Sequence, residues 1–107
     1  MASIEKVAAV SDIQPGEMRR VTVQGREVLL VNRKGDLLAF AAECTHAGAP
    51  LDEGELEDDV LECPWHGGRF SLESAQPVGG PPMEPLSRYK VILRGNDVLV
   101  DVGTSPA

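Results

Sequence analysis

The sequence predicts an all-β protein, an antiparallel sandwich or small barrel, on the strength of three observations. The 11 glycines and 8 prolines divide the 107 residues into short segments. Within these segments, apolar residues alternate with polar ones or form short runs, as in half-buried and buried strands. No segment has the apolar spacing of an amphipathic helix. A chain of this length can build one hydrophobic core, so we expect residues 1–107 to form a single domain.

Four strands are expected in the first 41 residues, and turn-forming residues end each of them. These strands are 5–10, 18–23, 27–32 and 37–41. The turns between them contain Gly16, Gly25 and Gly35. Because only residues 24–26 separate the second strand from the third, we expect a hairpin there.

Two more strands are expected near the C-terminus, at residues 86–93 and 98–102. In the second of these, Val98 and Val100 alternate with their neighbours, which places them on one face. Two stretches between the groups have little strand character, residues 43–50 and 63–85. Loops of a β scaffold are where function is usually carried, so we expect the functional site there.

The composition argues against several functional classes. A net charge of -7 is unfavourable for binding nucleic acid, because that binding depends on lysines and arginines that neutralise phosphates. No apolar run reaches the roughly 18 residues of a membrane-spanning helix, and residues 1–5 do not resemble a signal peptide. Two cysteines are too few for a secreted disulfide scaffold. We therefore expect a soluble, cytoplasmic protein.

Both cysteines and both histidines of the chain lie in the two strand-poor stretches. Cys44 and His46 form a Cys-x-His motif, and Cys63 and His66 form a Cys-x-x-His motif sixteen residues later. Thiolates and imidazoles are the ligands that bind zinc or iron–sulfur clusters. A tight hairpin predicted around residues 58–59 would bring the two stretches side by side. The sequence therefore predicts one four-ligand metal centre.

These motifs resemble those of the Rieske [2Fe-2S] proteins, and the resemblance covers nearly the whole chain. It rests on the two mixed ligand pairs, on a proline after the second cysteine and on a glycine after the second histidine. It implies a Rieske-type fold with a cluster-binding subdomain made of two loops. We expect the first loop at residues 43–50, the second loop at 63–70, and a proline loop at 77–85 that shields the cluster.

The resemblance also implies how the ligands are divided. In the family, two cysteines hold one iron and two histidines hold the other, which assigns Cys44 and Cys63 to the inner iron and His46 and His66 to the outer one. A zinc site that only staples two loops is the main alternative. The usual zinc motifs pair cysteine with cysteine and histidine with histidine, whereas each motif here is mixed.

The reduction potential is expected near the low end of the Rieske range, at about -150 mV. High-potential members carry an additional cysteine in each loop and two hydroxyl side chains that donate hydrogen bonds toward the cluster. This chain has Ala49 and Trp65 in place of those cysteines, and Gly68 and Phe70 in place of the hydroxyl residues. Fewer hydrogen bonds to the sulfurs leave the reduced form less stabilised.

The resemblance implies a non-catalytic one-electron carrier, similar to the ferredoxin component of aromatic-ring-hydroxylating dioxygenase systems. Such a protein takes electrons from a flavin-dependent ferredoxin reductase and passes them to a terminal oxygenase, and we expect it to be a monomer. Three alternatives stay open at this point: a ferredoxin for a diiron monooxygenase or another reductase system, a zinc-stapled interaction module, and a redox or iron sensor.

Residues 51–62 are strongly acidic and contain no basic residue. The seven acids are Asp52, Glu53, Glu55, Glu57, Asp58, Asp59 and Glu62. Two interpretations are open: a solvated hairpin surface, or a face that attracts basic redox partners toward the cluster. Arg19, Arg20, Arg33 and Lys34 are predicted to be solvated residues of turns and strand edges.

Overall fold

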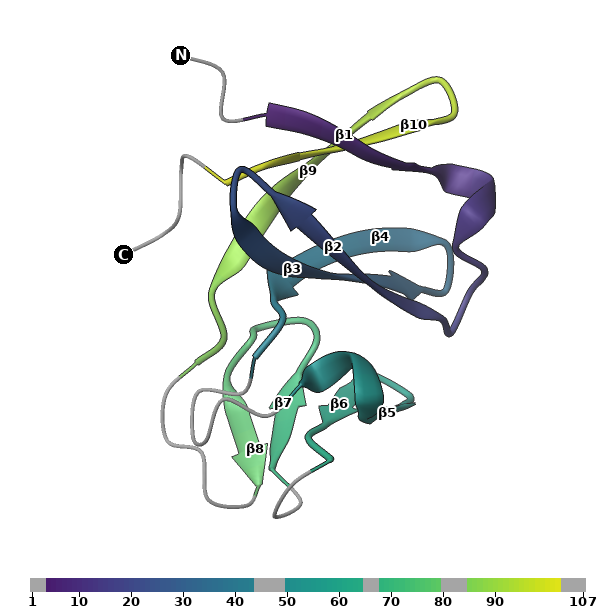
Figure 1. Cartoon of the computed structure of the whole chain (residues 1–107). Helices are drawn as coiled ribbons and strands as arrows, with labels where there is room; N and C mark the ends of the chain where they lie inside the picture. The colour runs from purple at the N-terminus through teal and green to yellow at the C-terminus, as the bar shows by residue number, and fades with distance from the viewer. Residues whose placement is uncertain (1–3, 44–49, 65–67, 80–84, 103–107) are drawn as a thin grey trace.

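The computed structural model describes residues 4–43, 50–64, 68–79 and 85–102, and Figure 1 shows their arrangement. These residues form ten strands and two short 3-10 helices, with no α-helix among them. The predicted all-β, antiparallel fold is confirmed. Within the described residues, no helix is long and apolar enough to cross a membrane.

The larger sheet has six antiparallel strands in the order β1-β10-β9-β4-β3-β2. Its strands are β1 (Ile4–Ala9), β2 (Met18–Val23), β3 (Arg26–Arg33), β4 (Asp36–Ala41), β9 (Arg88–Arg94) and β10 (Asp97–Asp101). The edge strands β1 and β2 contact each other, so the sheet curls into a nearly closed barrel. We call these six strands the barrel.

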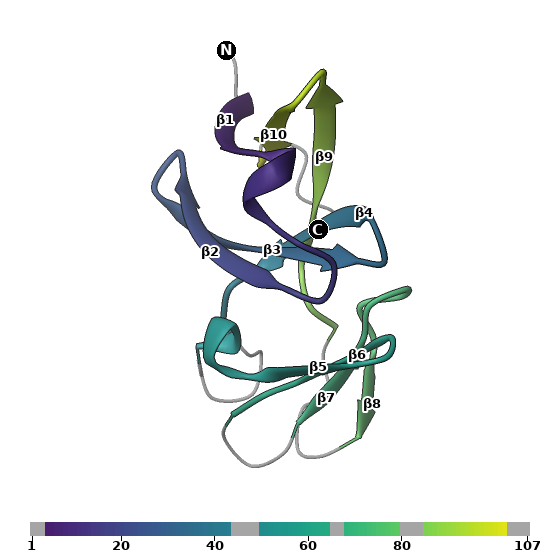
Figure 2. The same cartoon turned by 90° about the vertical axis from the view of Figure 1, so that its right-hand side faces the viewer.

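A smaller sheet lies at one end of the barrel, in the lower half of Figure 1, and its strands have the order β5-β6-β7-β8. They are β5 (Glu55–Glu57), β6 (Val60–Glu62), β7 (Arg69–Ser71) and β8 (Pro77–Gly79). The 3-10 helix η2 (Leu51–Glu53) leads into β5. We call η2, these four strands and the described turns between them the cap, and Figure 2 shows it from a second side. The predicted hairpin around residues 58–59 is confirmed, because β5 pairs with β6 across it.

Several predicted boundaries shift. The first strand covers residues 4–9 rather than 5–10, because the 3-10 helix η1 (Val10–Asp12) begins at Val10, and the Asp12 carboxylate accepts a hydrogen bond from the Ala9 amide. The strand expected at 86–93 begins only at Arg88. Leu86 instead packs in a core, and its amide donates to the carbonyl of Ala75.

Residues 63–85, which were expected to form loops with little strand character, contain two short strands. β7 starts inside the expected second loop, and β8 occupies the beginning of the expected proline loop. Each strand has three residues, which is too short for an alternating pattern to be recognised. Pro77 also suggests a turn, but it is compatible with β8, because β8 is an edge strand and its free edge needs no donor.

The strand β3 separates two hydrophobic cores and contributes side chains to both. Val28 and Leu30 face the interior of the barrel, while Leu29 and Val31 face the cap, and all four are fully buried. β4 repeats this division: Ala39 packs inside the barrel and Phe40 packs toward the cap. The period-two alternation of side chains in a strand thus supplies one face to each core.

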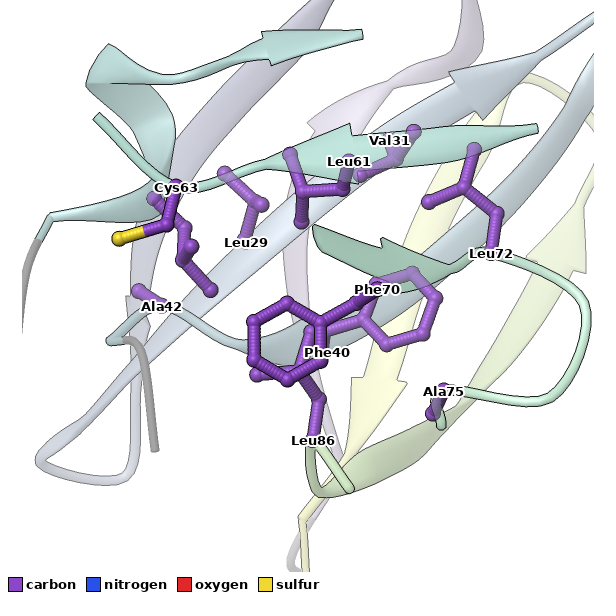
Figure 3. Close-up of a cluster of buried hydrophobic side chains, with 11 residues drawn as sticks. Leu29, Val31, Phe40, Ala42, Leu61, Cys63, Phe70, Leu72, Ala75 and Leu86 are labelled. Atoms are coloured by element: carbon purple, nitrogen blue, oxygen red, sulfur yellow. The ribbon is translucent and has the colours of Figure 1, made fainter. Parts of the chain in front are cut away.

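The two cores differ in composition. The buried residues of the barrel core are all aliphatic, and the partly buried Tyr89 packs against them. They are Ala8, Ile13, Val23, Val28, Leu30, Leu37, Ala39, Val98, Val100 and Val102. The core under the cap contains two aromatic rings and a cysteine, as Figure 3 shows. Its members are Leu29, Val31, Phe40, Ala42, Leu51, Leu61, Cys63, Phe70, Leu72, Ala75 and Leu86.

Candidate metal centre

Of the four predicted ligands, the structure describes Cys63. Cys44, His46 and His66 lie outside the described residues, as do Ala49 and Trp65. Among the residues that the structure does describe, there is therefore no cluster of three or more metal-binding side chains. The structure nevertheless shows where the chain enters and leaves each ligand-bearing loop.

Cys63 directly follows β6 and is 3% exposed. Its side chain belongs to the core under the cap, and Figure 3 shows the sulfur pointing away from the rings of Phe40 and Phe70. The Cys63 amide donates a hydrogen bond of 2.6 Å to the carbonyl of Gly68, which is also buried. This bond joins Cys63 to Gly68, two residues beyond the end of the Cys-x-x-His motif. A single backbone hydrogen bond therefore holds together the points where the chain leaves the small sheet and where it returns to it.

The ends of the first loop are joined in a similar way. Glu43 and Pro50 form an isolated antiparallel bridge, and the Leu51 amide donates to the carbonyl of Ala42 at 2.9 Å. Ala42 and Leu51 both pack in the core that contains Cys63. Both loops therefore start from the same small core, which agrees with the expectation that they lie side by side.

Two basic residues that were expected to be merely solvated connect the barrel to the acidic cap. Arg33 of β3 forms two hydrogen bonds to the carboxylate of Asp59, at 2.8 and 3.0 Å. Arg20 of β2 bonds to Glu27 of the barrel at 2.9 Å and to Asp52 of the cap at 3.1 Å. The prediction for these two arginines is wrong, because both form ion pairs with carboxylates of the cap. The paired residues lie 26 and 32 positions apart, so no local pattern in the sequence indicates them.

The ion pairs shift the pKa values of their members in the expected directions. The Arg33 guanidinium lowers the pKa of Asp59 below its ordinary value, and Asp59 in turn raises the pKa of Arg33. The pKa of Glu27 is lowered by the hydrogen bond from the Thr22 hydroxyl and then by Arg20. Hydrogen bonds to Glu27 and Asp52 raise the pKa of Arg20. All four groups are therefore held in their charged forms at neutral pH.

The seven acidic residues of the 51–62 segment fall into two groups, those paired with arginines and those exposed to solvent. Asp52 and Asp59 are bound to barrel arginines, and Glu62 lies 4.0 Å from Arg69 within the cap. The remaining four, Glu53, Glu55, Glu57 and Asp58, are exposed. Part of the acidic stretch therefore attaches the cap, and the other part forms a negative surface. An open hollow beside Cys63 includes Glu53, Glu55 and Glu62 in its wall.

The described part of the site fits an iron–sulfur cluster. A cysteine that is nearly buried, with its sulfur at the edge of an apolar core, can offer a thiolate to iron and exclude water from it. The two positions that carry hydroxyls in high-potential Rieske proteins are described here. Phe70 is fully buried in the core, and Gly68 contributes its backbone carbonyl to the bond with Cys63.

Comparison with known proteins gives a consistent result. The family model of the Rieske [2Fe-2S] domain matches residues 3–90. Ferredoxin CarAc from Metapseudomonas resinovorans is 44% identical over 97 residues, covering 89% of this chain and 90% of that protein. The ferredoxin component of biphenyl 2,3-dioxygenase from Rhodococcus jostii is 37% identical over 100 residues and covers 94% of both chains.

Solved structures agree with these matches. A chain from the complex of reduced oxygenase and oxidised ferredoxin in carbazole 1,9a-dioxygenase superposes with a TM-score of 0.88, at 36% identity over 94% of both chains. The ferredoxin of carbazole 1,9a-dioxygenase from Nocardioides aromaticivorans superposes with a TM-score of 0.86, at 32% identity over 92% of this chain and 97% of that one.

Proposed function

The chain belongs to the Rieske [2Fe-2S] domain family, and from this premise we propose which of its residues hold the cluster. Cys44 and Cys63 bind one iron through their thiolates. His46 and His66 bind the other iron through imidazole nitrogens. The cluster, when bound, takes up and releases a single electron. The Cys63 thiolate is held at the edge of an apolar core, where the side chains around it keep water from its iron.

Two observations support this assignment. The matched region, residues 3–90, includes both ligand motifs and all the cysteines and histidines of the chain. The backbone bonds that join the ends of each loop start from one shared core. Family membership also decides between the two metals that the ligand types left open, in favour of the iron–sulfur cluster.

The protein is a Rieske ferredoxin of the aromatic dioxygenase type, and its role is to carry electrons rather than to catalyse a reaction. The observation that carries this conclusion is its match to stand-alone ferredoxins. It is 44% identical to CarAc over 90% of that protein's length, whereas a terminal oxygenase from Nocardioides aromaticivorans is 26% identical and is covered over only 30% of its length.

The partners follow from this role. One of the similar structures is a complex of an oxygenase with its ferredoxin. The present chain is accordingly proposed to deliver electrons to a terminal oxygenase and to receive them from a flavin-dependent ferredoxin reductase. We propose that it acts as a monomer in the cytoplasm, because a small carrier must present its cluster to two partners in turn.

The ligand assignment is tested by metal and sulfide analysis together with EPR spectroscopy of the dithionite-reduced protein. We expect the wild type to contain a complete [2Fe-2S] cluster and Cys63→Ser to lose iron and sulfide. Glu73→Ala is the matched control, because Glu73 is an exposed cap residue whose backbone carbonyl, rather than its side chain, accepts a hydrogen bond from Arg88. A Cys63→Ser protein with the wild-type iron content and spectrum would contradict the assignment.

The carrier role is tested by reconstitution. The purified protein, a flavin-dependent reductase and a terminal dioxygenase are mixed, and oxygenated product is measured. We expect product formation to require this chain and to fail with Cys63→Ser. If the protein delivers electrons to a diiron monooxygenase but to none of the dioxygenases tested, it belongs to a different oxygenase system.

A further inference from the structure

Gly54 is the point where the chain leaving the first loop meets the chain entering the second. It ends η2, and its amide donates to the carbonyl of Leu51 at 3.0 Å. The next residue begins β5, where Glu55 pairs with Glu62. Antiparallel pairing therefore places Gly54 beside the peptide that joins Glu62 to Cys63.

The backbone at Gly54 leaves no room for a side chain. A Cβ placed there would overlap the carbonyl oxygen of Glu62 and would lie 3.2 Å from both the Glu62 carbonyl carbon and the Leu51 carbonyl oxygen. All three atoms belong to the backbone, so they cannot move aside as the end of a flexible side chain can. The φ angle of Gly54 is -82°, which any residue adopts. The requirement for glycine is therefore one of space and not of backbone conformation.

Each of the two contacting peptides is attached to one ligand loop. The Glu62 carbonyl shares a peptide plane with the Cys63 amide, and that amide forms the 2.6 Å bond to Gly68 that joins the ends of the second loop. The Leu51 amide donates a hydrogen bond to the Ala42 carbonyl, next to the β-bridge between Glu43 and Pro50 that closes the first loop. A group that separated Gly54 from Glu62 would therefore move one loop away from the other.

We propose that Gly54 is a positioning residue for the cluster, which sets the separation of the two ligand loops by letting their backbones touch. This inference rests on the ligand assignment proposed above. A [2Fe-2S] cluster that receives ligands from both loops imposes a fixed distance between them. A wider separation changes the coordination of the irons before it changes the fold of the barrel, since the barrel core shares no residue with this contact.

The test is Gly54→Ala in the full-length protein, purified beside the wild type. We expect reduced iron and sulfide content, shifted EPR g values of the reduced cluster, and a changed midpoint potential. Gly79→Ala is the matched control in the same small sheet. The three atoms nearest to a Cβ at Gly79 are side-chain atoms of Arg69, the nearest of them at 3.6 Å, which is ordinary contact. We expect this variant to keep the wild-type spectrum and potential.

A second variant separates positioning from general loss of stability. Leu61→Val removes volume from the core under the cap and leaves the contact between Gly54 and Glu62 intact. We expect it to lower the unfolding temperature without shifting the g values or the potential. A Gly54→Ala chain that is folded by far-UV circular dichroism but takes up no cluster, while Leu61→Val retains it, also supports the proposal.

Three results would overturn the inference. They are a wild-type spectrum and potential in Gly54→Ala, the same shifts in Leu61→Val, and an unfolded Gly54→Ala chain. A wild-type protein without a [2Fe-2S] cluster is a different result, because it contradicts the proposed ligand function itself.

Discussion

The barrel and the cap are built in contrasting ways. Barrel strands have five to eight residues, and their pairing runs along most of each strand, whereas every cap strand has three residues. The buried residues of the barrel core are aliphatic and come from its own strands and their connections. The cap core takes much of its volume from the outer face of β3 and β4. The cap therefore depends on the barrel, while the barrel core contains no cap residue.

This difference indicates how the protein separates stability from function. The long strands of the barrel bury aliphatic side chains, which is the main source of stability in a small domain. The cap has short strands with few backbone hydrogen bonds between them, and it carries the two loops that we propose hold the cluster. Attachment to the barrel, through Leu29 and Phe40 in the core and through Arg20 and Arg33 at the surface, holds those loops in place.

The sharpest test of this contrast compares two adjacent leucines of β3. Leu30 faces the barrel core and Leu29 faces the cap core, and both are fully buried. Each change to alanine should lower the free energy of unfolding by about 2–5 kcal/mol, because it removes the same side chain and leaves a cavity. Only Leu29→Ala should also accelerate the loss of iron. Urea denaturation gives the stability, and the decay of visible absorbance gives the rate of iron loss.

Equal rates of iron loss in the two leucine variants would break the contrast. They would mean that the cap and the barrel respond as one unit to any loss of core volume.

A second prediction concerns the polarity of the core under the cap. Phe70→Tyr adds a hydroxyl at the position where high-potential Rieske proteins carry one. If it donates to the cluster, the reduced and more negative form gains about 1 kcal/mol, which raises the midpoint potential on the order of 40 mV. Phe40→Tyr is the control, because Phe40 comes from the barrel side of the same core. Spectroelectrochemical titration measures both, and equal shifts in the two variants would contradict the prediction.

The ion pair between Arg33 and Asp59 predicts a dependence of stability on pH. Since Arg33 lowers the pKa of Asp59 in the folded chain, the stabilisation is complete above the ordinary aspartate pKa of about 4 and disappears as the pH falls through the lower, folded value. Asp59→Asn should therefore unfold at a lower temperature than the wild type at pH 6, and this difference should shrink below about pH 4. The decrease should be smaller than that in either leucine variant, because the pair is only partly buried and water still screens it.

Asp58→Asn is the control for this pH experiment. Asp58 is the exposed neighbour of Asp59, and its φ of 54° is one that asparagine adopts as readily as aspartate. A difference between wild type and Asp59→Asn that stays constant from pH 6 to pH 3 would show that the pair does not attach the cap. Thermal unfolding followed by far-UV circular dichroism measures all three proteins.

The smallest expected effect concerns the exposed acids of the cap. Glu55→Gln should slow association with a basic redox partner roughly two- to threefold at low salt, and the effect should vanish at about 1 M salt, where charges are screened within a few ångströms. Glu5→Gln removes the same charge from β1 in the barrel, far from the cap in Figure 1, and should leave the rate unchanged. Stopped-flow reduction of the partner oxygenase measures the rate. Equal slowing by both variants would indicate an effect of net charge alone.

Most of the barrel could be predicted from the sequence. The apolar run at residues 28–31 and the turn glycines locate β2, β3 and β4 to within one residue, because these strands are six to eight residues long and turn residues end each of them. The hairpin at residues 58–59 was also predictable. The strands β7 and β8 have three residues each, as β5 and β6 do, but they were missed because no tight turn like that at residues 58–59 joins them.

The candidate site shows the same division. The residue types and spacing of Cys44, His46, Cys63 and His66 predict one four-ligand metal centre, since the chemistry of thiolate and imidazole is a property of the residues themselves. The resemblance to the Rieske proteins selected the iron–sulfur cluster over zinc. The attachment of the cap by Arg33 to Asp59 and the contact of Gly54 with Glu62 were decided only by the tertiary structure. Arg33 and Asp59 lie 26 positions apart, so no local pattern of residues indicates their contact. Gly54 and Glu62 belong to one predicted hairpin, but how closely their backbones approach depends on how the strands are folded together.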